Sequence, residues 1–248
     1  MPDRVSSRVA GVRKWLTLGL VFLVSGTTAL AQSMLTPHSA EYKIRISVLG
    51  GELTTELRAT DAGYVAHHIV RPTGITKIIA QGTIAESSEF EIESDVVRPL
   101  HYISDDSLSR DKKRAEVDFD WSALIVRGMI NADPIEMALE GRAHDRVSIQ
   151  YELMHDLMNG KLGTRYILYD IDELKAINVT NIGRKQIRVP AGEYDAIGIQ
   201  HQTENSSRVT TLWCVPELDY LPVLIEQYRD GKLRVRASLK KYTPEEPT

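Results

Sequence analysis

The chain has 248 residues, a formal net charge of −4 and one cysteine, Cys214. A single cysteine excludes an intramolecular disulfide, and this mildly acidic balance argues against nucleic-acid binding, which needs a concentrated basic face. The basic run at 110–114 lies among acidic residues and is typical of a solvated loop. We therefore expect packing and strand pairing to stabilise the protein, and we expect no nucleic-acid partner.

The N-terminus has the pattern of a secretory signal peptide. Four basic residues precede an uncharged apolar stretch from Trp15 to Leu30, and Ala29-Leu30-Ala31 supplies the small-x-small pattern that a signal peptidase reads. The stretch is short for a membrane span, which needs about 20 apolar residues. An uncleaved N-terminal helix is the alternative. We expect cleavage after Ala31, a periplasmic location and no integral membrane span in the cleaved protein.

The segment after the predicted cleavage point alternates with a period of two, as half-buried antiparallel strands do. Its first apolar face consists of Ala40, Tyr42, Ile44, Ile46 and Val48. Gly50-Gly51 predicts a tight hairpin turn, and the strand returns over 52–59. Further strands are predicted over 64–70, 75–86, 101–104, 114–121 and 124–130.

One segment has helical periodicity instead. Its apolar positions recur at intervals of three and four residues, with Asp145 as the N-cap and Gly160 as the C-terminal stop. Strands resume over 165–171, 176–182, 185–189, 194–202, 209–215, 221–228 and 233–239. Asp230-Gly231 is the strongest hairpin signal in the chain. We expect one β-rich domain over 32–243 and a disordered tail over 244–248.

These elements predict a mainly β protein, with a large curved antiparallel sheet or incomplete barrel packed against one amphipathic helix. A sheet of ten or more strands curls, splits or closes, because exposed edges promote association. An outer-membrane barrel is the competing architecture, but it needs aromatic girdles. The chain contains only 3 Trp, 10 Tyr and 3 Phe, and the outer faces of its strands carry charges.

The His-Asp pairs at 144–145 and 155–156 are the candidates for metal chemistry. If both pairs lie along one helix, His144 and His155 are about 16 Å apart, too far to share an ion. We therefore expect no metal site, with Asp145 capping the helix and with His155 and Asp156 exposed on its surface. Cys214 lies in an apolar strand and is expected to pack as a small apolar residue. The sequence shows no assembled set of catalytic residues and indicates no cofactor.

Several motifs in the second half carry a family resemblance. They are Phe119-Asp120-Trp121, Asp145-Arg146-Val147-Ser148-Ile149, Val189-Pro190-Ala191-Gly192-Glu193-Tyr194, Trp213-Cys214-Val215-Pro216-Glu217 and Leu221-Pro222-Val223. Their order and spacing resemble those of the exported bacterial proteins grouped as domain of unknown function family 3108. The resemblance implies an envelope-located, mainly antiparallel β domain, and it transfers no catalytic residue.

We therefore expect a non-catalytic binding or carrier module for an amphiphilic, lipid-like ligand of the cell envelope. The alternatives are a structural or assembly partner of another envelope protein, and a hydrolase that acts on envelope material. The candidate ligand-binding residues are Trp121, Asp145, Ser148, Tyr151, Met154 and Trp213; a core role is the alternative for each. An apolar cavity would favour the carrier, whereas a solid core with an exposed apolar patch would favour the assembly partner.

Overall fold

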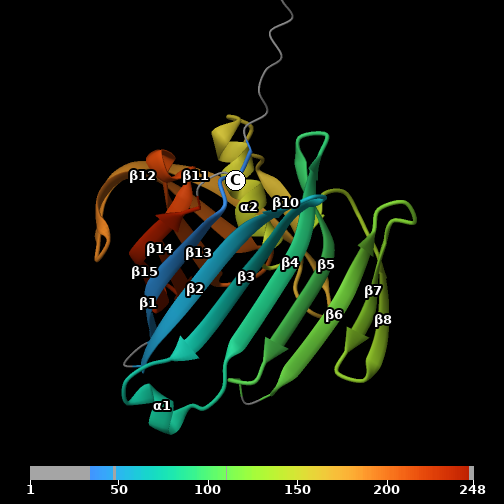
Figure 1. Ribbon diagram of the computed structural model, residues 1–248, viewed down its shortest axis with the longest axis horizontal. Coiled ribbons are helices and arrows are strands. Elements are labelled where there is room, and N and C mark those ends of the chain that lie inside the picture. Colours follow the sequence, from blue (N-terminus) through green and yellow to red (C-terminus); the bar gives the residue numbers. More distant parts are fainter. Residues whose placement is uncertain (1–33, 47–48, 110, 246–248) are drawn as a thin grey trace, which may run out of the picture. The chain divides into compact units, whose positions relative to one another are not determined.

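A computed structural model of the chain describes residues 34–46, 49–109 and 111–245, and most of these residues belong to one sheet (Figure 1). Its strands are β1 (His38–Ile46), β2 (Leu49–Thr60), β3 (Gly63–Pro72), β4 (Ile84–Glu93), β5 (Val96–Asp106), β6 (Lys113–Asp120), β7 (Ile125–Ile130), β8 (Asp133–Ala138), β9 (Ala143–His144), β10 (Arg165–Tyr169), β11 (Leu174–Val189), β12 (Gly192–Thr203), β13 (Arg208–Val215), β14 (Leu221–Arg229) and β15 (Lys232–Pro244). Two α-helices, α1 (Thr76–Ile79) and α2 (Ser148–Met158), and the 3-10 turn η1 (Pro216–Leu218) complete the described elements. The predicted signal peptide lies outside the described residues.

The sheet consists of two meanders that meet at one pair of strands. Its order is β8-β7-β6-β5-β4-β3-β2-β1-β15-β14-β13-β12-β11-β10-β9, and β1 pairs with β15. Neighbouring strands are antiparallel, except that β9 pairs with β10 in parallel. The sheet stays open, with β8 and β9 at its two edges, and it curves around α2 (Figure 1). The predicted class, a large curved antiparallel sheet with a packed helix, is confirmed.

The predicted alternation of β1 is confirmed from Ala40 to Ile44, but Ile46 of the same predicted face is 44% exposed and Val48 lies outside the described residues. The adjoining turn is also not where its glycines indicated. Ala40, Tyr42 and Ile44 are buried, while Lys43 and Arg45 between and after them are exposed. Gly51 pairs with Ile44 inside the β1–β2 ladder, so both glycines lie in β2 and do not form the turn. A Cβ on Gly51 would lie 3.1 Å from a carbonyl oxygen of β3, so close strand packing accounts for this glycine.

Two other predicted elements differ from the structure. The predicted strand over 75–86 divides into α1 and the start of β4, with Gly82 at a φ of 120° between them. The predicted strands over 176–182 and 185–189 are one long strand, β11, which is irregular between Asn181 and Gly183. In both places an apolar, β-branched run does not distinguish a strand from a short helix or a bulge.

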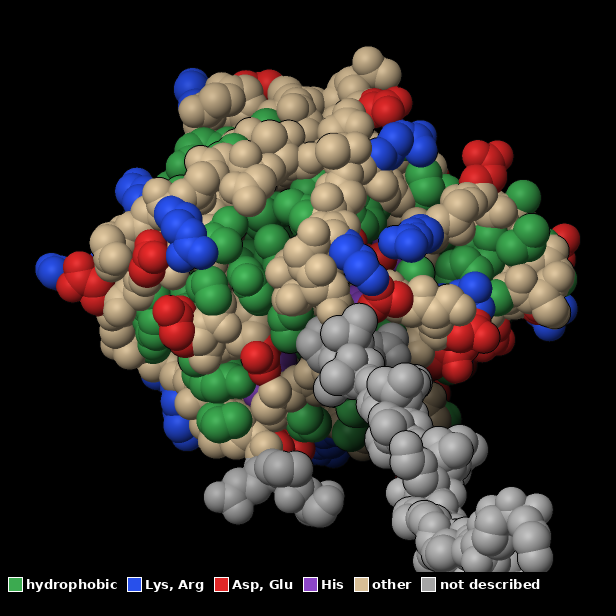
Figure 2. Space-filling model, turned by 90° about the horizontal axis from the view of Figure 1, so that it is seen from above, with side chains coloured by type: hydrophobic (Ala, Val, Ile, Leu, Met, Phe, Trp, Pro, Cys, Tyr) green, Lys and Arg blue, Asp and Glu red, His purple; other side chains and the backbone are tan. Residues whose placement is uncertain are grey.

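The space that the sheet encloses is filled by side chains. Tyr42, Tyr102, Tyr151 and Tyr169 are each at most 1% exposed and lie in the same core. Viewed from the end at which α2 lies, hydrophobic side chains form patches between charged side chains (Figure 2). None of the described helices is long and apolar enough to cross a membrane. At the C-terminus, β15 reaches Pro244, one residue beyond the predicted domain boundary.

Candidate functional site

The N-terminus of α2 is held by a reciprocal cap. The Ile149 N–H donates to the Asp145 carbonyl over 3.1 Å, so Asp145 caps the turn that leads into α2; the regular helix begins at Ser148, with Val147 at its N-cap position, two residues after the predicted one. Its carboxylate accepts the N–H groups of Val147 (2.7 Å) and Ser148 (2.8 Å), and Ser148 Oγ accepts the Asp145 N–H (2.9 Å). Ser88 Oγ on β4 donates to the other carboxylate oxygen over 2.6 Å. The cap therefore satisfies the free helix donors and ties α2 to the sheet.

Tyr151 and Met154 lie on the face of α2 that packs into the main core. Tyr151 is 0% exposed and its ring stacks on Phe90 of β4, with the ring centres 5.3 Å apart. The rings of His38 and His68 lie 6.4 and 6.1 Å from it. Met154 is 2% exposed in the same core. Tyr151 therefore joins α2 to strands β1, β3 and β4, and Met154 packs in the same core.

Neither of the two candidate tryptophans is a residue of α2. Trp121 follows β6, where its indole N–H donates to the Pro99 carbonyl over 2.8 Å. Trp213 of β13 lies between Leu212 and Cys214, which pack in a cluster with Leu153 and Leu157 of α2. The pairing of β13 with β14 is irregular between Trp213 and Cys214, and Trp213 belongs to the main core together with Tyr151 and Met154, against which Trp121 also packs. Four candidates therefore belong to α2 and its cap, and the two tryptophans contribute to the same core from the sheet. Their role in ligand binding stays a prediction.

Cys214 is buried and 1% exposed, as expected for a packing residue. Burial raises the pKa of its thiol to about 12, so the reactive thiolate is disfavoured at neutral pH.

A cluster of ionisable side chains lies on the remaining face of α2. It consists of Glu152, His155 and Asp156 on the helix and His144 on β9, each at most 2% exposed. Ligand atoms of the three helix residues all lie within 4.8 Å of one another. His144 Nε2 is 3.8 Å from Glu152 Oε1. The prediction that His155 and Asp156 are exposed on the helix surface was wrong, because strands of the sheet enclose this face as well.

Neighbouring residues hold the two carboxylates of the cluster in place. The Val97 N–H of β5 donates to Glu152 Oε2 over 2.8 Å, and the Tyr166 hydroxyl of β10 donates to Asp156 Oδ2 over 2.5 Å. The Arg142 guanidinium lies 3.7 Å from Glu152 Oε1, but its side chain is 57% exposed. Each carboxylate of the cluster thus has one oxygen held by a hydrogen bond, and the exposed Arg142 guanidinium lies at the edge of the cluster.

Burial shifts the pKa of each group in this cluster toward its uncharged form. It raises the pKa of Glu152 to about 7 and also raises that of Asp156, although the Tyr166 hydrogen bond lowers the latter. It lowers the pKa of His144 to about 3 and also lowers that of His155. The buried environment therefore favours the uncharged form of all four side chains.

The helical spacing of Glu152, His155 and Asp156 was visible in the sequence, since i, i+3 and i+4 share one face. The position of His144 was not. Ala143 and His144 form a short strand beside β10, which lets His144 reach the second turn of α2 from outside the helix. The predicted separation of about 16 Å assumed that both histidines lie along one helix axis.

We expect the change Glu152→Gln to stabilise the protein at pH 8 but not at pH 4.5. Between the unfolded pKa of about 4.3 and the folded value of about 7, the folded state binds more protons, so wild-type stability falls as pH rises. Glutamine does not titrate, and the advantage of the variant should grow to roughly 3 kcal/mol at pH 8, at 1.36 kcal/mol per pKa unit. Urea unfolding at several pH values, with a chelator present, measures the difference in unfolding free energy between the variant and the wild type. Parallel pH profiles for the two proteins would contradict the assignment.

The fold defines a β-barrel-like protein: an open antiparallel sheet curved around a helix. It is similar to the crystal structure of a beta-barrel-like protein of domain of unknown function DUF1849 from Brucella abortus, with a TM-score of 0.58. The sequences are 12% identical, and the match covers 87% of this chain and 100% of that chain. At this identity the likeness concerns the fold alone.

The family model for a protein of unknown function, DUF3108, matches residues 39–238. The chain therefore belongs to the DUF3108 family, as its motifs indicated. No curated protein matches it.

Proposed function

We propose that this protein is an exported, non-catalytic envelope module that binds the surface of an anionic lipid membrane through the loop that contains α1. The supporting observation is the exposure of Ile75, Ile78 and Ile79, at 72%, 78% and 70%. Helix α1 lies at the end of the sheet opposite to α2 (Figure 1). Because side chains fill the space around α2, we place the expected contact with an amphiphile at this exposed end of the sheet and not in an interior cavity. The predicted signal peptide supports a location in the envelope.

Hydrogen bonds hold the loop at both ends, so the loop does not have to become ordered when its isoleucines bind. The Gly50 N–H donates to Thr76 Oγ1 over 2.9 Å, and the Thr73 N–H donates to the Gly50 carbonyl over 3.0 Å. At the other end, the Thr83 N–H donates to Ser107 Oγ over 2.9 Å. A preorganised loop loses less entropy when it binds.

The basic charge around this loop and the small number of its exposed apolar side chains favour a lipid surface over a protein partner. Arg71 at the end of β3 and Lys77 of α1 lie beside these isoleucines in the sequence, and the segment from Arg71 to Ala85 contains no acidic residue. Three side chains are far fewer than the 20–30 residues a side of a standard protein interface. They suffice for insertion, since each buried isoleucine contributes about 1.5 kcal/mol or more. Each basic residue adds about 1 kcal/mol near an anionic surface. The sum predicts weak, reversible binding, comparable to that of one myristoyl chain.

The change of Ile75, Ile78 and Ile79 together to serine should reduce binding to phosphatidylglycerol vesicles by more than about 100-fold, because it removes at least ~4 kcal/mol of apolar burial. Vesicle sedimentation with the full chain measures this change. Folding should be unaffected, because these side chains are already exposed.

Leu124→Ser is the matched control, since Leu124 is 54% exposed in the β6–β7 turn and should not contribute. Binding to phosphatidylcholine vesicles should be weaker and less dependent on salt. Equal binding by the wild type and the triple variant, or no vesicle binding by the wild type, would refute the proposal.

A further inference from the structure

We infer that the buried cluster on α2 is a binding site for one divalent transition-metal ion of the Zn²⁺ class, with Glu152, His155, Asp156 and His144 as ligands. The inference is independent of the proposed membrane function. Two imidazoles and two carboxylates form a donor set that such ions accept in four-coordinate sites. The ion would sit between α2 and β9, inside the sheet.

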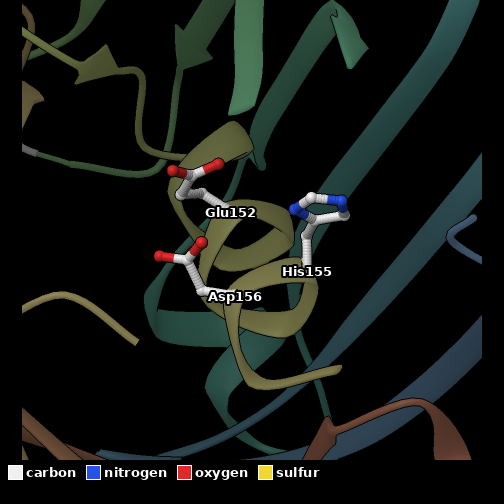
Figure 3. Close-up of side chains that lie close together, drawn as sticks. All are labelled: Glu152, His155 and Asp156. Atoms are coloured by element: carbon white, nitrogen blue, oxygen red, sulfur yellow. The ribbon is translucent and has the colours of Figure 1, made fainter. Parts of the chain in front are cut away.

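The geometry fits an ion after small side-chain rotations. Ligand atoms of Glu152, His155 and Asp156 all lie within 4.8 Å of one another. In a tetrahedral site with bonds of about 2.0–2.2 Å, ligand atoms are about 3.4 Å apart. Figure 3 shows the carboxylates of Glu152 and Asp156 on one side of the helix, with one ring nitrogen of His155 directed toward them. Glu152, His155 and Asp156 therefore need to close by up to about 1.4 Å to share an ion. His144 lies outside this group of three and would join it through Nε2, which is 3.8 Å from Glu152 Oε1.

The unpartnered polar atoms of the cluster are a second, separate observation. His144 is 0% exposed, and neither of its ring nitrogens has a hydrogen-bond partner among the described residues. Its Nε2 points to Glu152 Oε1, 3.8 Å away, and that oxygen also lacks a hydrogen bond. Nδ1 of His155 is unpartnered as well. Buried polar atoms without hydrogen bonds are costly, and one cation would satisfy three of these four, namely His144 Nε2, Glu152 Oε1 and His155 Nδ1.

The surroundings orient these ligands as the second shell of a metal site does. Glu152 Oε2 and Asp156 Oδ2 are held by Val97 and Tyr166, which leaves the other oxygen of each carboxylate for the ion. Asp95 Oδ1 lies 3.5 Å from His155 Nε2 and favours the tautomer that carries the proton there, with Nδ1 as the ligand. The Asn159 amide nitrogen also lies 3.1 Å from Nε2 and donates to the His155 carbonyl over 2.9 Å, so Asp95 is the acceptor for a proton on Nε2.

The first experiment measures metal binding by the unmodified full chain. After treatment with a chelator and its removal, titration with Zn²⁺ should show one ion per chain and raise the thermal unfolding temperature. Co²⁺ should bind at the same stoichiometry and produce the d–d absorption of a four-coordinate site with nitrogen and oxygen ligands. These measurements require no variant, so they remain decisive if substitutions in the core impair folding.

Variants then locate the ion. Glu152→Gln and His155→Gln should each weaken Zn²⁺ binding by more than about 100-fold, since even the loss of an outer hydrogen-bonding partner costs ~10–100-fold. His101→Gln is the matched control: His101 forms an exposed pair with Asp118, 2.8 Å apart, and its removal should leave affinity unchanged. Arg142→Gln should bind Zn²⁺ roughly tenfold more tightly, because a competing positive charge is removed.

Three outcomes of these titrations decide whether the cluster binds an ion. One ion in the wild type and His101→Gln, with loss in the two ligand variants, supports the site. No binding of Zn²⁺ or Co²⁺ by the wild type overturns it. Binding that persists in the double variant of Glu152 and His155 also overturns it, because the ion would then be held elsewhere on the chain.

Discussion

Replacement of Tyr151 by alanine is expected to lower the free energy of unfolding by about 3–5 kcal/mol, the range for removal of a fully buried aromatic ring. Tyr151 is 0% exposed and stacks on Phe90, so the change removes contacts that join α2 to the sheet and leaves a cavity. Met154→Ala, in the same core, should cost about 2–5 kcal/mol. Urea unfolding followed by circular dichroism measures both.

Tyr151→Phe is the matched control for this prediction. The Tyr151 hydroxyl has no hydrogen-bond partner among the described residues, so its removal should change stability by less than about 1 kcal/mol. If Tyr151→Ala kept wild-type stability and instead lost affinity for a lipid, Tyr151 would line a pocket and would not be part of the core.

Replacement of Asp145 by alanine is expected to cost about 3–5 kcal/mol at pH 8. The change leaves three buried donors without an acceptor: the Ser88 hydroxyl and the N–H groups of Val147 and Ser148. Loss of an N-cap alone costs about 0.5–2 kcal/mol, and each unsatisfied buried group adds about 1–3 kcal/mol. Burial raises the pKa of Asp145 to about 6, so at pH 8 the wild-type carboxylate is ionised and accepts all three bonds.

Asp145→Asn and Ser88→Ala test the separate parts of this cap. Asparagine is a good N-cap, so it should retain most of the helix stability. Ser88→Ala should cost only about 1–2 kcal/mol, because it removes one bond to a charged acceptor. Thermal unfolding of the three variants under one condition ranks them. An Asp145→Ala loss no larger than that of Ser88→Ala would contradict the cap assignment.

The strand pattern of this protein was largely readable because period-two alternation is a local signal. Asp230 and Gly231, with φ values of 52° and 70°, form the predicted hairpin turn. Pro190 and Ala191 form the turn between β11 and β12. The short strand β8 and the helix α1 were missed, since each is an apolar or mixed run without a distinctive period.

The amino-acid sequence by itself determined the mainly β class, the position of the helix and its cap at Asp145, because these depend on residues near one another in the chain. Only the tertiary structure decided that β1 pairs with β15 and that the sheet curves around α2. That curvature buries Glu152, His155 and Asp156 beside His144, and it leaves the isoleucines of the α1 loop exposed. Burial depends on contacts between distant segments, and helical or strand periodicity does not encode which faces those segments cover.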